Sequence, residues 1–180
     1  MIGGITFMGW FHTIVGIPAI LAGLYLLLRD KFIYIDTGLA KFYLIATFIT
    51  SASSLLIYRA TGSFNTAHFL SVMTILAVIF AYILHRNNIF RYFNIYLKQL
   101  ALTGTVFFSM LPTTAEVLQR VPPNNPFASS IEDPLVQNFY MSYVVIFGIF
   151  AIYQIIKISK GEMNEIWKLW WSCKSITKGS

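Results

Sequence analysis

Charged residues are scarce in this sequence. Of its 180 residues, 11% are charged and 57% are hydrophobic, and the mean hydropathy is +0.67. A soluble domain carries roughly 25% charged residues, so this chain has too few charges to cover a water-facing surface. We therefore expect most of its outer surface to face lipid.

Cysteine, proline and glycine are also sparse. The single cysteine, Cys173, excludes an intramolecular disulfide. Six prolines and eleven glycines are too few for a low-complexity chain. The net charge of +6 does not indicate nucleic-acid binding, because no RNP-like, zinc-finger or helix-turn-helix pattern accompanies it. We expect the basic residues to set the topology and to contact anionic membrane lipid.

Long apolar runs are what the sequence does contain. A hydrocarbon core about 30 Å thick needs about 20 apolar residues as helix, and five runs reach or approach that length. They are too long and continuous for barrel strands. They predict an all-α integral membrane protein with a single five-helix transmembrane domain over residues 1–158, or four spans if the weakest run, 95–111, is re-entrant. The expected spans are residues 6–28, 39–58, 67–84, 95–111 and 139–156.

Lysine and arginine alternate between the connections, which predicts the orientation. The chain before the first span has none, and the second and fourth connections have only Arg59 and Arg120. The first and third connections and the tail are richer in basic residues. By the positive-inside rule, this pattern places the N-terminus outside and the C-terminus in the cytoplasm, in a bacterial inner membrane.

Two segments lie outside the expected spans. The proline-rich stretch 112–138 is expected to form an outer loop, in which Thr113 or Thr114 caps a short helix that Pro122 ends. The tail, residues 159–180, carries tryptophans beside lysines. This pattern predicts an interfacial amphipathic helix on the inner leaflet, acting as an anchor or, alternatively, as a docking surface for a partner.

Polar residues within the spans need a reason, because an ionisable group there is costly. His12 lies early in the first span and His68 begins the third, so the topology places both at a similar outer depth. His85 lies at the opposite end of the third span and cannot share a ligand with them. Gln99 and Gln154 are expected to bond across helices.

Two imidazoles at one depth on two helices could bind a divalent metal or the iron of haem b. The metal interpretation takes His12, His68 and Glu116 as ligands. Alternatively, each histidine bonds only a backbone carbonyl or water, since no H-x-x-x-H, C-x-x-C or H-E-x-x-H motif is present. The haem interpretation keeps both histidines. It takes Arg59 or Arg120 as a propionate partner, and Trp10 and Phe69 as pocket walls.

Three stretches carry a resemblance: "FHTIVGIPAILAG", "GLAKFYLIATFITSASSLLIY" and "FLSVMTILAVIFAYILHRNN". With H-x-x-x-G in the first span, a glycine and a tyrosine opening the second and "AYILHRN" ending the third, residues 7–111 resemble a family of bacterial multi-pass inner-membrane proteins of unknown function. The resemblance implies the fold and no particular activity.

Catalytic patterns do not emerge from the sequence. No Ser/His/Asp order, paired carboxylates or glycine-rich phosphate loop can be assembled, which argues against an enzyme. The favoured function is an accessory or scaffold subunit that binds other membrane subunits through helix faces and the tryptophan-rich tail. The alternatives are a haem- or metal-binding redox protein that uses His12 and His68, and a small transporter.

Overall fold

The computed structural model describes residues 7–56 and 65–161. Helix makes up 82% of these residues, and none of them forms a strand. Five of the helices are long and apolar enough to cross a membrane, as the apolar runs predicted. In chain order the elements are α1 (Phe7–Asp30), α2 (Gly38–Leu56), α4 (Thr66–Arg86), the short 3-10 helix η1 (Arg91–Phe93), α5 (Asn94–Arg120) and α6 (Pro134–Ser159).

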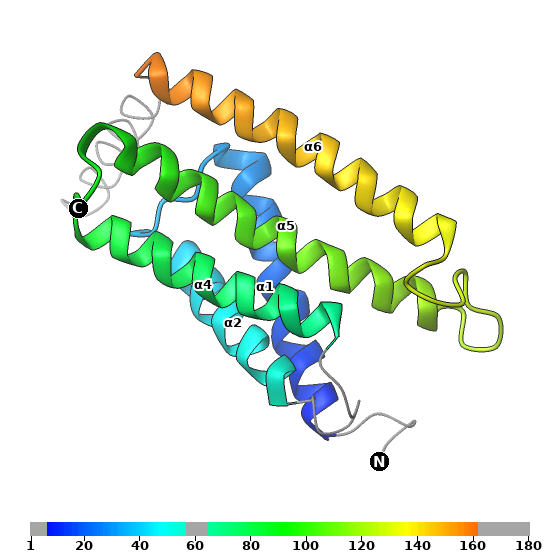
Figure 1. Cartoon of the computed structure of the whole chain (residues 1–180). Coiled ribbons are helices and arrows are strands. Elements are labelled where there is room, and N and C mark those ends of the chain that lie inside the picture. Colours follow the sequence, from blue (N-terminus) through cyan, green and yellow to red (C-terminus); the bar gives the residue numbers. More distant parts are fainter. Residues whose placement is uncertain (1–6, 57–64, 162–180) are drawn as a thin grey trace, which may run out of the picture.

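Four helices share the core, and α6 lies at its edge (Figure 1). The main cluster of buried apolar side chains comes from α1, α2, α4 and α5 together with the connection between α1 and α2. In these four helices, 33–39% of the most apolar stretch is buried, against 6% in α6. The helix α6 therefore packs on α5 and leaves most of its surface outside the bundle.

A glycine lets α1 and α2 approach closely at the centre of the bundle. A Cβ atom on Gly23 would lie 2.6 Å from Cε2 of Tyr43 and 3.0 Å from Cγ2 of Val106. The buried Tyr43 hydroxyl in turn lies 2.6 Å from Oγ1 of Thr105 on α5. Gly23 thus makes room for an aromatic ring that links α2 to α5.

The structure corrects the expected outer loop over residues 112–138. The helix α5 continues through Pro112 to Arg120, and α6 already begins at Pro134. Thr113 does not cap a new helix, because its hydroxyl donates to the Ser109 carbonyl one turn back, at 2.8 Å. The prediction of a separate short helix is wrong, although the helix does end just before Pro122, as expected.

The connection that remains, residues 121–133, closes the α5–α6 hairpin. Asp133 caps α6 by accepting the Leu135 N–H at 3.0 Å. Ala128 is buried against the two helices, beside Ala115 and Val136. The tail beyond residue 161 and residues 57–64 lie outside the described residues. The predicted amphipathic helix belongs to that tail.

Candidate functional site

His12 ties α1 to α2. Its Nδ1 lies 3.0 Å from the Thr50 carbonyl oxygen and 3.1 Å from Oγ of Ser53. A carbonyl only accepts, so the bond to Thr50 uses the form of the ring with a proton on Nδ1. The contact is the bond to a backbone carbonyl that the alternative to metal or haem binding predicted for His12.

His68 has a local role at the start of α4. The side chain of Asn65 accepts the His68 N–H at 3.2 Å, and the Asn65 N–H donates to Nδ1 of His68 at 3.3 Å. The pair forms a capping box, which satisfies backbone donors at a helix start. The buried His68 ring is therefore engaged by its own helix end.

The other predicted site residues have contacts of their own or lie exposed. Glu116 forms an exposed ion pair with Arg120 one turn along α5. Trp10 and Phe69 are 41% and 54% exposed, on the outer surfaces of α1 and α4. Arg59 lies outside the described residues.

These placements bear on the metal and haem interpretations. Over residues 7–56 and 65–161, no group of three or more histidine, cysteine or acidic residues could hold a metal ion. The proposed ligand set of His12, His68 and Glu116 is therefore not assembled. The haem interpretation, which takes Trp10 and Phe69 as pocket walls, stays a prediction.

The more elaborate polar site lies at the other end of the bundle, around the connection between α1 and α2. Phe32, Ile33 and Ile35 of this connection are buried, and Lys31 adopts a positive φ of 62° as the chain leaves α1. A connection that folds inward brings backbone N–H and C=O groups with it. Such groups need partners when they are removed from water.

Two glutamine side chains supply these partners. Gln99 on α5 accepts the Ile33 N–H at 3.2 Å and donates to the Ile33 carbonyl at 3.1 Å. Gln154 on α6 donates to the Lys31 carbonyl at 2.7 Å and accepts the Thr103 hydroxyl at 2.8 Å. We call this set the glutamine clamp. The expectation of a bond across helices is confirmed for Gln154, which bonds Thr103 of α5. Gln99 bonds the inward-folded connection instead, and neither contact with that connection was predicted.

The same end of the bundle is basic. His85 Nε2 lies 3.3 Å from the Asp36 carboxylate, joining the end of α4 to the α1–α2 connection. Arg29 and Asp30 form an ion pair at 2.6 Å. Tyr34, in the same connection, is partly buried, and this burial, with a smaller effect from the charge of Asp30, raises its pKa to about 12. We refer to this end as the basic end.

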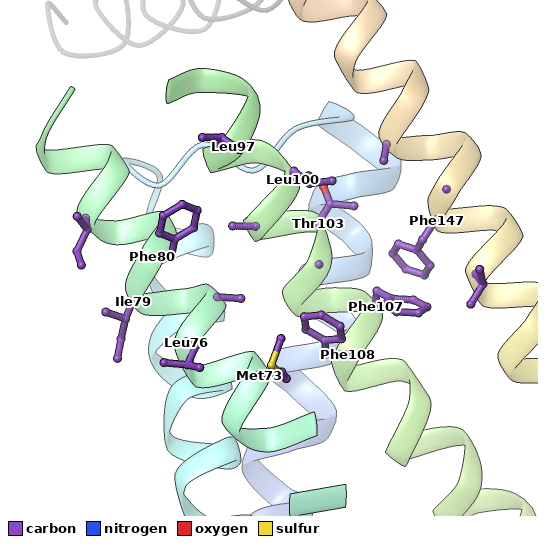
Figure 2. A pocket seen from close by; sticks show the side chains of 17 residues that line it. Met73, Leu76, Ile79, Phe80, Leu97, Leu100, Thr103, Phe107, Phe108 and Phe147 are labelled. Carbon is purple, nitrogen blue, oxygen red and sulfur yellow. The ribbon is translucent and has the colours of Figure 1, made fainter. Parts of the chain in front are cut away.

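An apolar groove of about 880 Å³ opens between α4, α5 and α6 (Figure 2). The polar side chain in its lining, Thr103, uses its hydroxyl to bond Gln154. A smaller apolar hollow, of about 390 Å³, lies between the first turns of α1 and the last turns of α2. The larger groove is lined by Met73, Leu76, Ala77, Ile79, Phe80, Ile83, Leu97, Leu100, Ala101, Thr103, Gly104, Phe107, Phe108, Val144, Phe147, Gly148 and Ala151.

Fold and contacts together define an all-helical protein whose five long helices are apolar enough to cross a membrane. Comparison with known proteins adds no family: the chain matches no protein family model, no curated protein and no solved structure. The resemblance over residues 7–111 stays a prediction.

Proposed function

We propose that this protein is a subunit without catalytic chemistry of its own, an accessory or scaffold component of a larger complex in a bacterial inner membrane. The observation that carries this proposal is the position of α6. Only 6% of its most apolar stretch is buried, although it is one of the five helices that can span the bilayer.

The outward face of α6 supports a role in docking. A stripe of side chains, each 47–64% exposed, follows one face of the helix at spacings of three and four residues. Opposite this stripe, Gln154 and Ile158 are buried toward the rest of the protein. Membrane helices associate mainly through side-chain packing, and this stripe offers a continuous surface for it. We call it the α6 stripe: Met141, Val145, Ile149, Ile152 and Ile156.

The polar interior supports the same proposal. Gln99 and Gln154 both bond the inward-folded connection, and Gln154 also bonds Thr103 of α5. Tyr43 and Thr105 likewise bond each other. These side chains serve to join helices, which is the role of a scaffold rather than of a reaction centre.

We also propose that the basic end faces the cytoplasm. The described residues of this end carry Arg29, Lys31, Arg86, Arg91 and Lys160. At the opposite end, the described part of the chain has Arg120, and it pairs with Glu116. By the positive-inside rule, the N-terminus then lies outside.

Site-specific photo-cross-linking tests the docking role. A photoreactive residue at Ile149, in the α6 stripe, should give one protein adduct of defined mass in intact membranes. The matched control is Ile14 on α1, which is equally exposed at 64% and lies outside the stripe. Adducts to lipid alone from Ile149, or the same protein adduct from both positions, would contradict the proposal.

A further inference from the structure

The groove between α4, α5 and α6 has the depth of one lipid leaflet. Along α4 its lining runs from Met73 to Ile83 and along α5 from Leu97 to Phe108, which corresponds to about 15 Å at about 1.5 Å per residue. A bilayer's hydrocarbon core is about 30 Å thick. The groove therefore covers half of the membrane, whereas a spanning partner helix would need a surface across all of it.

The groove starts at the basic end. Ile79 and Ile83 line it, and Arg86 follows on the same face of α4, three residues further on. Arg91 lies in the turn that joins α4 to α5. The basic mouth of the groove thus lies at the end of α4 and in the turn that follows it.

Within residues 7–56 and 65–161, no carboxylate forms an ion pair with a basic residue of this mouth. Within the part of the chain that the structure describes, the acidic residues at this end are Asp30, which pairs with Arg29, and Asp36, which contacts His85. No ion pair joins Arg86 or Arg91 to a described carboxylate. Positive charge at the mouth and an apolar interior together suit an amphiphile with an anionic head.

Two glycines keep the groove open. A Cβ atom on Gly148 of α6 would meet nothing within 4 Å, and one on Gly104 of α5 would meet only the ring of Phe108, at 3.8 Å. The rings of Phe107 and Phe147 lie between α5 and α6, with centroids 5.4 Å apart, and the ring of Phe108 lies on the α4 side of α5 (Figure 2). The hollow is therefore open where these two glycines carry no side chain, and it is wide enough for an alkyl chain.

We propose that this groove binds one acyl chain of an anionic phospholipid from the leaflet at the basic end, with the lipid phosphate close to Arg86. The site goes beyond the proposed subunit function and does not depend on it. It would hold a lipid in the isolated chain as well as in a complex.

Lipid titration followed by native mass spectrometry tests the site. The full chain, purified in mild detergent, is titrated with palmitoyl-oleoyl phosphatidylglycerol and, separately, with palmitoyl-oleoyl phosphatidylcholine. We expect a one-lipid adduct whose apparent Kd is about fivefold lower for phosphatidylglycerol, the ratio given by about one basic residue near an anionic lipid. The Arg86→Gln variant should bind both lipids equally, whereas Lys41→Gln, which removes a charge at the same end on α2, should keep the preference.

Blocking the groove tests the acyl chain. Gly148→Phe should lower the binding of both lipids at least tenfold, whereas Val145→Phe, on the neighbouring outward face of α6, should leave it unchanged; the tenfold margin corresponds to about 1.4 kcal/mol. Gly148→Leu repeats the test with a smaller side chain, and helical circular dichroism checks that each variant is folded.

Three results would overturn the proposal. One is equal affinity of the unaltered chain for the two lipids. Another is undiminished lipid binding by folded Gly148→Phe and Gly148→Leu. The third is a dimer without bound lipid that Gly148→Phe dissociates, which would make the groove an interface between two copies.

Discussion

Replacing Gln154 with leucine removes one half of the glutamine clamp. The side chain is 2% exposed, so the change takes place in the interior and nearly preserves its volume. It deletes the bond to the Lys31 carbonyl at 2.7 Å and the bond from the Thr103 hydroxyl at 2.8 Å. Gln99 still holds Ile33, so the effect should fall on the attachment of α6.

The expected loss follows from those two contacts. An interhelical hydrogen bond in a membrane protein contributes about 0.6 kcal/mol on average and at most about 1.7 kcal/mol. Two such bonds predict that Gln154→Leu lowers the free energy of unfolding by about 1–3 kcal/mol. The large values would reflect a partly buried Lys31 carbonyl left without a partner.

Denaturant titration in mixed micelles, followed by circular dichroism, measures this loss. The control is Gln119→Leu, because the Gln119 side chain bonds only within α5, to the Ala115 carbonyl; its effect should stay within about 0.5 kcal/mol. In a double-mutant cycle, Thr103→Val and Gln154→Leu should be non-additive, since they remove the same bond. Wild-type stability of Gln154→Leu, or strict additivity with Thr103→Val, would refute the clamp.

Three further predictions concern other parts of the bundle. Gly23→Ala should destabilise the protein by about 1–3 kcal/mol because its methyl group would overlap the ring of Tyr43; Gly148→Ala, where the space is open, should have almost no effect, and equal thermal unfolding of the two variants would contradict this packing. His12→Ala should cost about 0.6 kcal/mol or somewhat more through its lost interhelical bond, measured by the same denaturant titration, and a gain in stability would argue against it. The pKa of Tyr34 is raised to about 12 from its ordinary value of 10.0, so the folded state favours the neutral phenol: the resulting stability is complete below pH 10.0 and is lost as the pH rises toward 12. Tyr34→Phe should reduce that decline in a thermal unfolding series, and an unchanged series would contradict it.

The sequence predicted the helices well and their ends less well. Apolar runs of spanning length are a direct requirement of the bilayer, which is why all five were located. The end of α5 was not, because Pro112 was interpreted as the end of a span. In the structure the helix continues past Pro112 to Arg120, and hydropathy alone does not register such an extension beyond the apolar stretch.

The polar contacts were predictable only in part. Gln99 and Gln154 were expected to bond across helices, but both bond backbone atoms of the α1–α2 connection, 66 and 123 residues away. Only the inward fold of the α1–α2 connection brings those atoms within reach. The apolar residues of that connection, Phe32 to Ile35, are the signal in the sequence that could have indicated its burial.

The histidines show the opposite difficulty, since local chemistry was overlooked. Asn65 and His68 are three residues apart, the spacing of a capping box, whose usual partner at the later position is Glu or Gln. His12 was considered both as a ligand and as a donor to a backbone carbonyl, and the structure shows the second contact. Each ring has a hydrogen-bond partner of its own, Thr50 for His12 and Asn65 for His68.

The mass of the protein after gentle extraction tests the central claim most directly. The membrane that contains the chain is dissolved into polymer-bounded lipid discs without detergent, and the released particle is weighed by native mass spectrometry. The account predicts a particle that contains the 20.5 kDa chain together with a fixed number of other protein subunits. It also predicts that bulky substitutions in the α6 stripe release them. A particle that holds one 20.5 kDa chain and lipid alone would contradict the proposed role as a subunit.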